Sequence, residues 1–252
     1  ETFPNVWGWF ATTGNGTALL SLMIDGRRGS VAGRGTLDQF YSTLVHQMKE
    51  AKTWLADAVP MGAVSSRTAT STLRIPVVED GQVVLGDAAL TIDPLSGHGC
   101  YEAFRAAFTM PAVINTLVRG DDCDLAAQFH TERLQESFER HARMGRELYA
   151  LETRWKSHPF WTERSAWPSH VEETAPKLHG GKVLVRPVIE NDLIVPREVV
   201  VTPEHPLGVW RVGDIPIVPL MKGNLQSRGP QTAAANNWLK QHGLLDAREA
   251  TV

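Results

Sequence analysis

The stretch VVLGDAALTIDPLSGHGCYEAF, from Val83 to Phe104, constrains the fold more than any other part of the chain. Its β-branched start predicts a short strand, its Pro and Gly residues predict a turn, and its end predicts a helix. At such a helix start, free backbone N–H groups and the positive end of the helix dipole favour negative charge. The stretch is therefore either a plain connecting turn, with Asp87 and Asp93 as caps, or a site that holds an anionic group.

The segment before this stretch predicts antiparallel sheet followed by a helix. Residues 5–10 and 17–24 read as strands joined by the turn TTGNG, which is typical of a hairpin. Thr36 and Gln39 have capping-box spacing, so we expect a helix from there to about Leu55. Further strands are expected over residues 63–75 and as two short runs around the turn in VVEDGQVVLGD.

The segment after this stretch predicts two helices. We expect a helix over residues 100–118 that is broken or bent near Pro111, with three aromatic side chains anchoring it from below. A long amphipathic helix follows over residues 124–155, capped by Asp121 or Asp122. The anchoring aromatics are Tyr101, Phe104 and Phe108, and the inward residues of the long helix are Leu125, Phe129, Leu134, Phe138, Ala142 and Leu148.

Residues 157–181 are rich in Pro and Gly, which is typical of a linker. Residues 182–252 alternate β-branched runs with proline turns and end in a helical pattern, so they predict a small β-rich C-terminal domain.

Composition excludes several classes of protein. The 252 residues are 42% hydrophobic and 21% charged, as in ordinary globular proteins. A net charge of −3 argues against nucleic-acid binding, and the apolar runs are too short for a membrane helix. Two cysteines cannot build a disulfide framework, and no signal pattern opens the sequence, so a cytoplasmic location is expected. His130 and His141 lie eleven residues apart, so we read them as surface or packing residues and propose no metal site.

The spacing within the quoted stretch resembles a known flavin motif. Gly-Asp-Ala-Ala at residues 86–89, followed by Pro-x-x-Gly-x-Gly at residues 94–99, resembles the second flavin motif of FAD-dependent aromatic monooxygenases. The resemblance implies an α/β (α+β) chain, the carboxyl-terminal part of a p-hydroxybenzoate hydroxylase-like FAD fold. It implies a substrate-binding sheet domain over residues 1–82 and a flavin strand-turn-helix with its long helix over residues 83–156. The tail at residues 182–252 would then serve in peptide docking.

In this family the motif holds the flavin, and the same roles are implied here. Asp87 would hold the ribityl chain, Pro94 would pack beside the isoalloxazine ring, and the Gly97–Gly99 turn would bring N–H groups to the N1/O2 edge. His98 would either face the pyrimidine edge or be an exposed loop imidazole. The implied FAD-binding set is Gly86, Asp87, Asp93, Pro94, Leu95, Ser96, Gly97, His98 and Gly99, of which Pro94, Gly97 and His98 are the catalytic candidates.

One part of the family's pattern is missing. The amino-terminal half of these enzymes holds a Gly-x-Gly-x-x-Gly turn after a strand, and this sequence contains no such unit. We therefore expect the missing half to lie on a separate chain or segment and this chain alone to bind FAD poorly.

The form of the motif is closest to the branch with tryptophan halogenases and the flavoprotein that hydroxylates a peptide tryptophan in tryptophylquinone biogenesis. Trp7-Gly8-Trp9 keeps two tryptophans of the halogenase signature Trp-x-Trp-x-Ile-Pro but lacks its Ile-Pro. The resemblance implies a monooxygenase that uses FAD, with NAD(P)H as donor and no metal, and hydroxylates an aromatic ring through a flavin C4a-hydroperoxide. The tail favours a polypeptide substrate, so the expected target is a tryptophan side chain of a peptide precursor in quinone cofactor biogenesis. A halogenase and a non-catalytic docking protein are the alternatives. Candidate substrate residues on the sheet are Trp7, Trp9, Thr12, Arg67 and Thr70, each with cross-strand packing or solvent exposure as the alternative reading.

Overall fold

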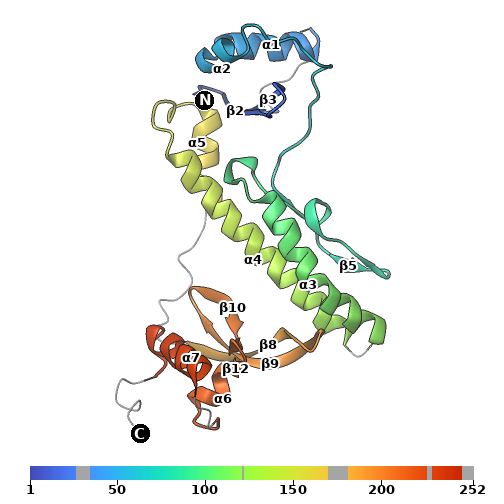
Figure 1. Ribbon diagram of the computed structural model, residues 1–252, viewed down its shortest axis with the longest axis vertical. Coiled ribbons are helices and arrows are strands. Elements are labelled where there is room, and N and C mark those ends of the chain that lie inside the picture. The colour runs from blue at the N-terminus through green and yellow to red at the C-terminus, as the bar shows by residue number, and fades with distance from the viewer. Residues whose placement is uncertain (27–34, 121, 170–180, 226–228, 246–252) are drawn as a thin grey trace. The chain divides into compact units, whose positions relative to one another are not determined.

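A computed structural model describes residues 1–26, 35–120, 122–169, 181–225 and 229–245. The chain divides into two compact units (Figure 1). Unit 1 comprises Glu1–Thr70 and Ala142–Ser169, and unit 2 comprises Ser71–His141 and His170–Val252. The chain mixes helices and sheets, which agrees with the fold class expected from the sequence.

Unit 1 contains the predicted hairpin. Strands β1 (Thr2–Phe3), β2 (Val6–Thr12) and β3 (Ala18–Ile24) form an antiparallel sheet in the order β1-β2-β3. Because successive side chains of a strand alternate between faces, Gly8 and Phe10 share one face and Trp7 and Trp9 share the other. A Cβ at Gly8 would lie 2.4 Å from the Cε of Met48, so glycine lets the following helices approach this face.

The sequence predicts a single helix ending near Leu55, but the structure has two helices there. Helix α1 (Leu37–Gln47) begins with the predicted Thr36–Gln39 capping box. Met48 then takes an extended backbone, with ψ of 126°, and α2 (Lys49–Trp54) begins after it. The Glu1 carboxylate accepts hydrogen bonds from the first N–H groups of α2, which stabilises this second start.

The long helix α4 (Cys123–Ala150) ends five residues before the expected boundary, and a short helix follows in the expected linker. This helix, α5 (Pro159–Ser165), buries Phe160 and Trp161. Trp161 donates its Nε1–H to the Phe3 carbonyl at 2.7 Å, which ties α5 to β1. The rest of the expected linker, residues 170–180, lies outside the described residues.

The predicted strand over residues 63–75 is mostly wrong. Residues 63–71 take no regular structure, and only β4 (Thr72–Leu73) pairs, with β7 (Leu90–Thr91). The Thr- and Ser-rich composition favours strands, but the residues find no ladder partner in the described part of the chain. The next prediction is confirmed, since β5 (Val78–Glu79) and β6 (Gln82–Val83) form a hairpin. Its turn has positive φ at Asp80 and Gly81, the conformation a tight hairpin requires.

Helix α3 (Gly99–Arg119) and residues 123–141 of α4 belong to unit 2 (Figure 1). Helix α3 continues through Pro111, so the expected break is absent. Asp122 caps α4 through its bond to Leu125 N, as predicted, whereas Asp121 lies outside the described residues.

The expected role of the α3 aromatics is wrong. Tyr101, Phe104 and Phe108 are 59%, 67% and 84% exposed, so they do not anchor the helix. The helix is instead anchored through residues of its C-terminal half. The core there contains Met110, Ala112, Val113, Ala126, Phe129 and Ile194.

The tail is β-rich with a terminal helix, as predicted. Strands β8 (Lys182–Glu190), β9 (Leu193–Thr202) and β10 (His205–Val209) form an antiparallel sheet in the order β10-β9-β8. The short strands β11 (Arg211–Val212) and β12 (Ile215–Pro216) pair beside the helices α6 (Ile217–Met221) and α7 (Pro230–Gln241).

The tail sheet and α3 share a core. Ile194 of β9 packs with Val113 and Phe129, and its N–H donates to the Thr116 hydroxyl of α3 at 2.8 Å. Residues 181–225 and 229–245 thus pack within the same unit as the helices. In the described residues, none of the helices is long and apolar enough to cross a membrane.

Candidate functional site

The stretch from Val83 to Phe104 folds into a series of tight turns in unit 2 and the start of α3. After β6, the 3-10 turn η1 (Gly86–Ala88) leads into β7, and the 3-10 turn η2 (Pro94–Ser96) leads into α3. Gly86 has φ of +58°, a conformation that a side chain would strain. Asp87 follows it with an exposed side chain.

Asp93 and Gly97 fix the second turn. The Asp93 carboxylate accepts a hydrogen bond from Leu95 N at 2.9 Å, so Asp93 is a cap, as the plain-turn reading holds. Ser96 Oγ donates to the Asp93 carbonyl at 3.0 Å. Gly97 then takes φ of +69° and donates its N–H to the Pro94 carbonyl at 3.0 Å.

The surface beside this turn is open, as a flat ligand requires. A Cβ placed on Gly97 or Gly99 would meet no atom within 4 Å. The first helical hydrogen bond of α3 runs from Glu102 N to the His98 carbonyl, at 3.0 Å. The N–H groups before it, from Gly99 to Tyr101, therefore have no acceptor within the helix and point out of its start. The turn offers backbone donors and a helix dipole to a polar or anionic edge.

His98 joins the turn to a second imidazole on α4. Its Nδ1 contacts the Ser96 carbonyl, which requires a proton on that nitrogen. The ring centroid lies 5.5 Å from that of His141. His141 is buried, so it is a packing residue and not a surface residue, the two roles that the sequence left open. His130 is also buried, and its Nε2 contacts the Val84 carbonyl at 2.7 Å.

Glu102, in the first turn of α3, is a buried carboxylate that the sequence analysis missed. Its two oxygens accept hydrogen bonds from Ser137 at 2.6 Å, Arg140 at 2.9 Å and Arg105 at 3.0 Å. Burial alone would raise its pKa, but the Ser137 hydrogen bond, the charge of Arg105 and the remaining hydrogen bonds together hold that pKa below its ordinary value. The spacing of Ser137, Arg140 and His141 at i, i+3 and i+4 was the available signal, since it predicts a polar patch on the inner face of α4.

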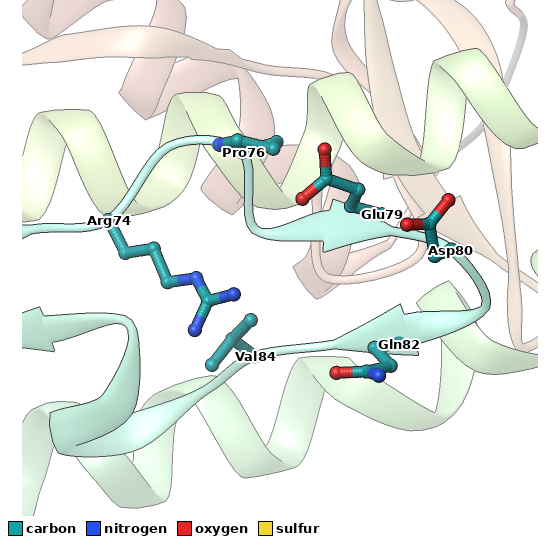
Figure 2. Close-up of a pocket in the computed structure, with 6 residues that line it drawn as sticks. All are labelled: Arg74, Pro76, Glu79, Asp80, Gln82 and Val84. Atoms are coloured by element: carbon teal, nitrogen blue, oxygen red, sulfur yellow. The ribbon is translucent and has the colours of Figure 1, made fainter.

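A shallow pocket of about 220 Å³ lies at the hairpin that precedes the turn. Figure 2 shows the Arg74 side chain pointing into the space between the segment with Pro76 and Glu79 and the strand with Val84. Asp80 and Gln82 complete the lining. None of the predicted flavin residues lines this pocket, so it is separate from the turn.

The candidate substrate residues of unit 1 do not form one surface. Trp7 is buried and donates its Nε1–H to the Tyr149 hydroxyl at 3.1 Å, so it serves in packing. Trp9 is 54% exposed on the same face of the sheet. By strand alternation, Thr12 points to the opposite face. Arg67 and Thr70 lie in the irregular segment, where Arg67 donates to the Ser66 carbonyl. Trp9 is the one exposed aromatic side chain of the five.

No family model matches the chain. It is 28% identical over 127 residues to a digeranylgeranylglycerophospholipid reductase of Methanosphaerula palustris, and this match covers 50% of the chain and 30% of the reductase.

Two solved structures share the fold over 97% of the chain. One is the peptidyl tryptophan dihydroxylase QhpG, essential for tryptophylquinone cofactor biogenesis, with a TM-score of 0.81 and 30% identity. The other is the flavin-dependent halogenase CmlS, with a TM-score of 0.64 and 17% identity. The chain spans 60% of the length of QhpG and 56% of that of CmlS. These similarities confirm the resemblance to the flavin-dependent hydroxylase and halogenase branch and its fold.

Proposed function

We propose that this chain is the flavin-turn and substrate-sheet part of an FAD-dependent monooxygenase that hydroxylates a tryptophan side chain of a peptide precursor during quinone cofactor biogenesis. The observation that carries the proposal is the open Gly97–Gly99 turn at the start of α3, in a chain with 30% identity to a peptidyl tryptophan dihydroxylase. An open turn with a helix start behind it suits the polar edge of a flavin.

The proposed roles follow from the positions of the turn residues. The exposed Asp87 carboxylate accepts hydrogen bonds from ribityl hydroxyls, and the exposed Pro94 ring packs beside the isoalloxazine. The N–H of Gly97 is used within the turn, so the free N–H groups from Gly99 onward would face the flavin edge that becomes negative on reduction. Leu95, Ser96 and Asp93 hold the turn in shape through their mutual hydrogen bonds. When bound, the FAD supplies the redox chemistry that activates O₂, and the protein binds, orients and excludes water.

A second polypeptide segment completes the proposed enzyme. The sequence contains no Gly-x-Gly-x-x-Gly unit for the ADP part of FAD, and the chain matches only 60% of the dihydroxylase. We propose that the missing dinucleotide-binding half is supplied by a separate chain or segment and that NAD(P)H reduces the flavin.

The substrate side of the proposal rests on Trp9 and on the tail. Trp9 offers an exposed indole on the hairpin, against which an aromatic side chain can stack. The β-rich tail, residues 182–252, is the proposed docking surface for the peptide. The halogenase neighbour supports a second candidate, halogenation of tryptophan, in which the same turn holds the same cofactor.

The test is spectroscopic. The chain is purified together with the dinucleotide-binding half, and an absorbance band near about 450 nm, bleached by NADH and restored by air, is expected for bound FAD. Mass spectrometry of a tryptophan peptide after turnover is expected to show a gain of about 16 mass units for each oxygen atom added. A chlorinated or brominated product would show that the enzyme is a halogenase and not a hydroxylase. A folded but colourless complex would refute both enzyme functions and favour a docking protein.

A further inference from the structure

A buried imidazole lies directly behind the open turn. The His141 side chain is 1% exposed. Its Nδ1 lies 2.8 Å from the Ser137 carbonyl, which can only accept, so Nδ1 carries the proton in the neutral ring. Nε2 therefore presents a lone pair, and this buried atom has no hydrogen-bond partner among the described residues.

Titratable and charged side chains from α3, α4 and the turn lie around this imidazole. Glu102 of α3 places Oε1 3.7 Å from Nε2, and Arg140 of α4 binds the same carboxylate oxygen at 2.9 Å. Arg105 of α3 binds the other oxygen. His98, from the turn itself, has its ring centroid 5.5 Å away.

The surroundings of His141 have opposing effects on its neutral and its protonated forms. A lone pair facing a carboxylate oxygen in a buried site is unfavourable, whereas Nε2–H would be a donor directed at Glu102. Burial, followed by the charges of Arg140 and His98, opposes protonation and lowers the pKa of His141, although its contact with Ser137 and the charge of Glu102 act the other way. Additional negative charge at the turn would shift this balance toward the charged ring.

We propose that His141 is the proton-accepting residue that balances negative charge at the Gly97–Gly99 turn, with Glu102 as its counter-charge and His98 as the turn residue beside it. One proton from solvent binds Nε2 and no other bond changes. The inference rests on the proposed function for the source of the charge, which is the reduced cofactor. His141 lies buried behind the turn and touches no proposed cofactor or substrate atom, so it is a positioning residue rather than a catalytic one.

The first experiment needs no cofactor, because the charge is introduced by substitution. The chain is labelled with ¹⁵N-histidine and titrated by NMR as His98→Glu and as the neutral control His98→Gln. His141 is expected as the Nδ1–H tautomer at neutral pH, and its protonation midpoint should lie at higher pH in His98→Glu than in His98→Gln. An Nε2–H tautomer, or equal midpoints in the two variants, would overturn the proposal.

Two further comparisons separate a charge effect from a general change in the fold. His130 is buried on the same helix, but its Nε2 contacts the Val84 carbonyl, so it should show the Nε2–H tautomer and the same midpoint in both variants. Glu102→Gln should move the His141 midpoint to lower pH. The His98 pair alters only a half-buried turn residue, so its result stands if Glu102→Gln fails to fold.

A cofactor experiment distinguishes this inference from the proposed function. In the complex with the dinucleotide-binding half, His141→Gln should reduce the slope of the flavin midpoint potential against pH, and His130→Gln should leave it unchanged. An unchanged slope in His141→Gln would refute the coupling between His141 and the cofactor. The binding of FAD in that experiment would still support the proposed monooxygenase function. If no flavin binds, the proposed function fails, and the His98 pair still decides whether His141 responds to charge at the turn.

Discussion

The Ser137 hydroxyl of α4 donates a 2.6 Å hydrogen bond to Glu102 Oε2 in the first turn of α3. Arg140, from the next turn of α4, binds the other oxygen of the same carboxylate at 2.9 Å. One buried side chain thus joins the helix that begins at the open turn to the helix behind it. Its acidic character also suits the positive end of the α3 dipole.

Glu102→Ala should lower the free energy of unfolding by about 2 to 3 kcal/mol, because it leaves the Ser137 hydroxyl and two guanidinium groups without their buried acceptor. Chemical denaturation followed by circular dichroism measures the change. Glu139→Ala is the matched control, since Glu139 is an exposed carboxylate on α4, and it should change stability by less than about 0.5 kcal/mol. Equal losses in the two variants would contradict the structural role of Glu102.

Lowering the pH should reduce the free energy of unfolding, in part because Glu102 becomes protonated. The folded-state pKa of Glu102 lies below its ordinary value of 4.5, so its contribution is complete above pH 4.5 and is lost as the pH falls through the lowered value. We expect the difference in unfolding free energy between the native chain and Glu102→Gln to shrink over this acidic range. Denaturation curves at a series of pH values test it, and a difference that stays constant would show that Glu102 does not titrate abnormally.

Local chemistry in the sequence predicted the elements that depend on neighbouring residues. The Thr36–Gln39 capping box, the Asp80-Gly81 turn and the Asp122 cap each need only a few adjacent residues, and each is confirmed. The flavin motif, whose spacing lies within one stretch, likewise identified the turn that the structure leaves open at Gly97.

What the sequence missed depends on contacts between distant residues. The helix break at Met48 accompanies a contact with Gly8 and a cap from Glu1, neither of which is near it in sequence. Residues 63–71 have strand-like composition but find no partner strand in the described residues. Phe104 and Phe108 fit an apolar helix face, but apolar spacing does not tell which of two faces of α3 is packed.

The Gly97 conformation should matter more for flavin binding than for stability. Gly97→Ala forces a side chain into φ of +69° and should cost about 1 kcal/mol of stability, while placing a methyl group on the open surface where the ring is proposed to lie. Gly120→Ala imposes similar strain, at φ of +70°, where α3 ends. Flavin absorbance in the complex with the dinucleotide-binding half should fall only for Gly97→Ala. A similar loss of flavin in both variants would assign the effect to strain and not to the turn.

Trp7 and Trp9 lie two residues apart on one strand, but they should respond to substitution in opposite ways. Trp7→Ala should destabilise the chain by about 3 to 5 kcal/mol, because it empties a buried site and removes the hydrogen bond to Tyr149. Trp9→Ala should cost less than about 1 kcal/mol, since half of its side chain is already in water. If Trp9 stacks on the substrate, its removal should instead weaken binding of a tryptophan peptide about tenfold, as measured by calorimetry with the complex. Unchanged affinity in a folded Trp9→Ala variant would exclude this face of the sheet from the substrate site.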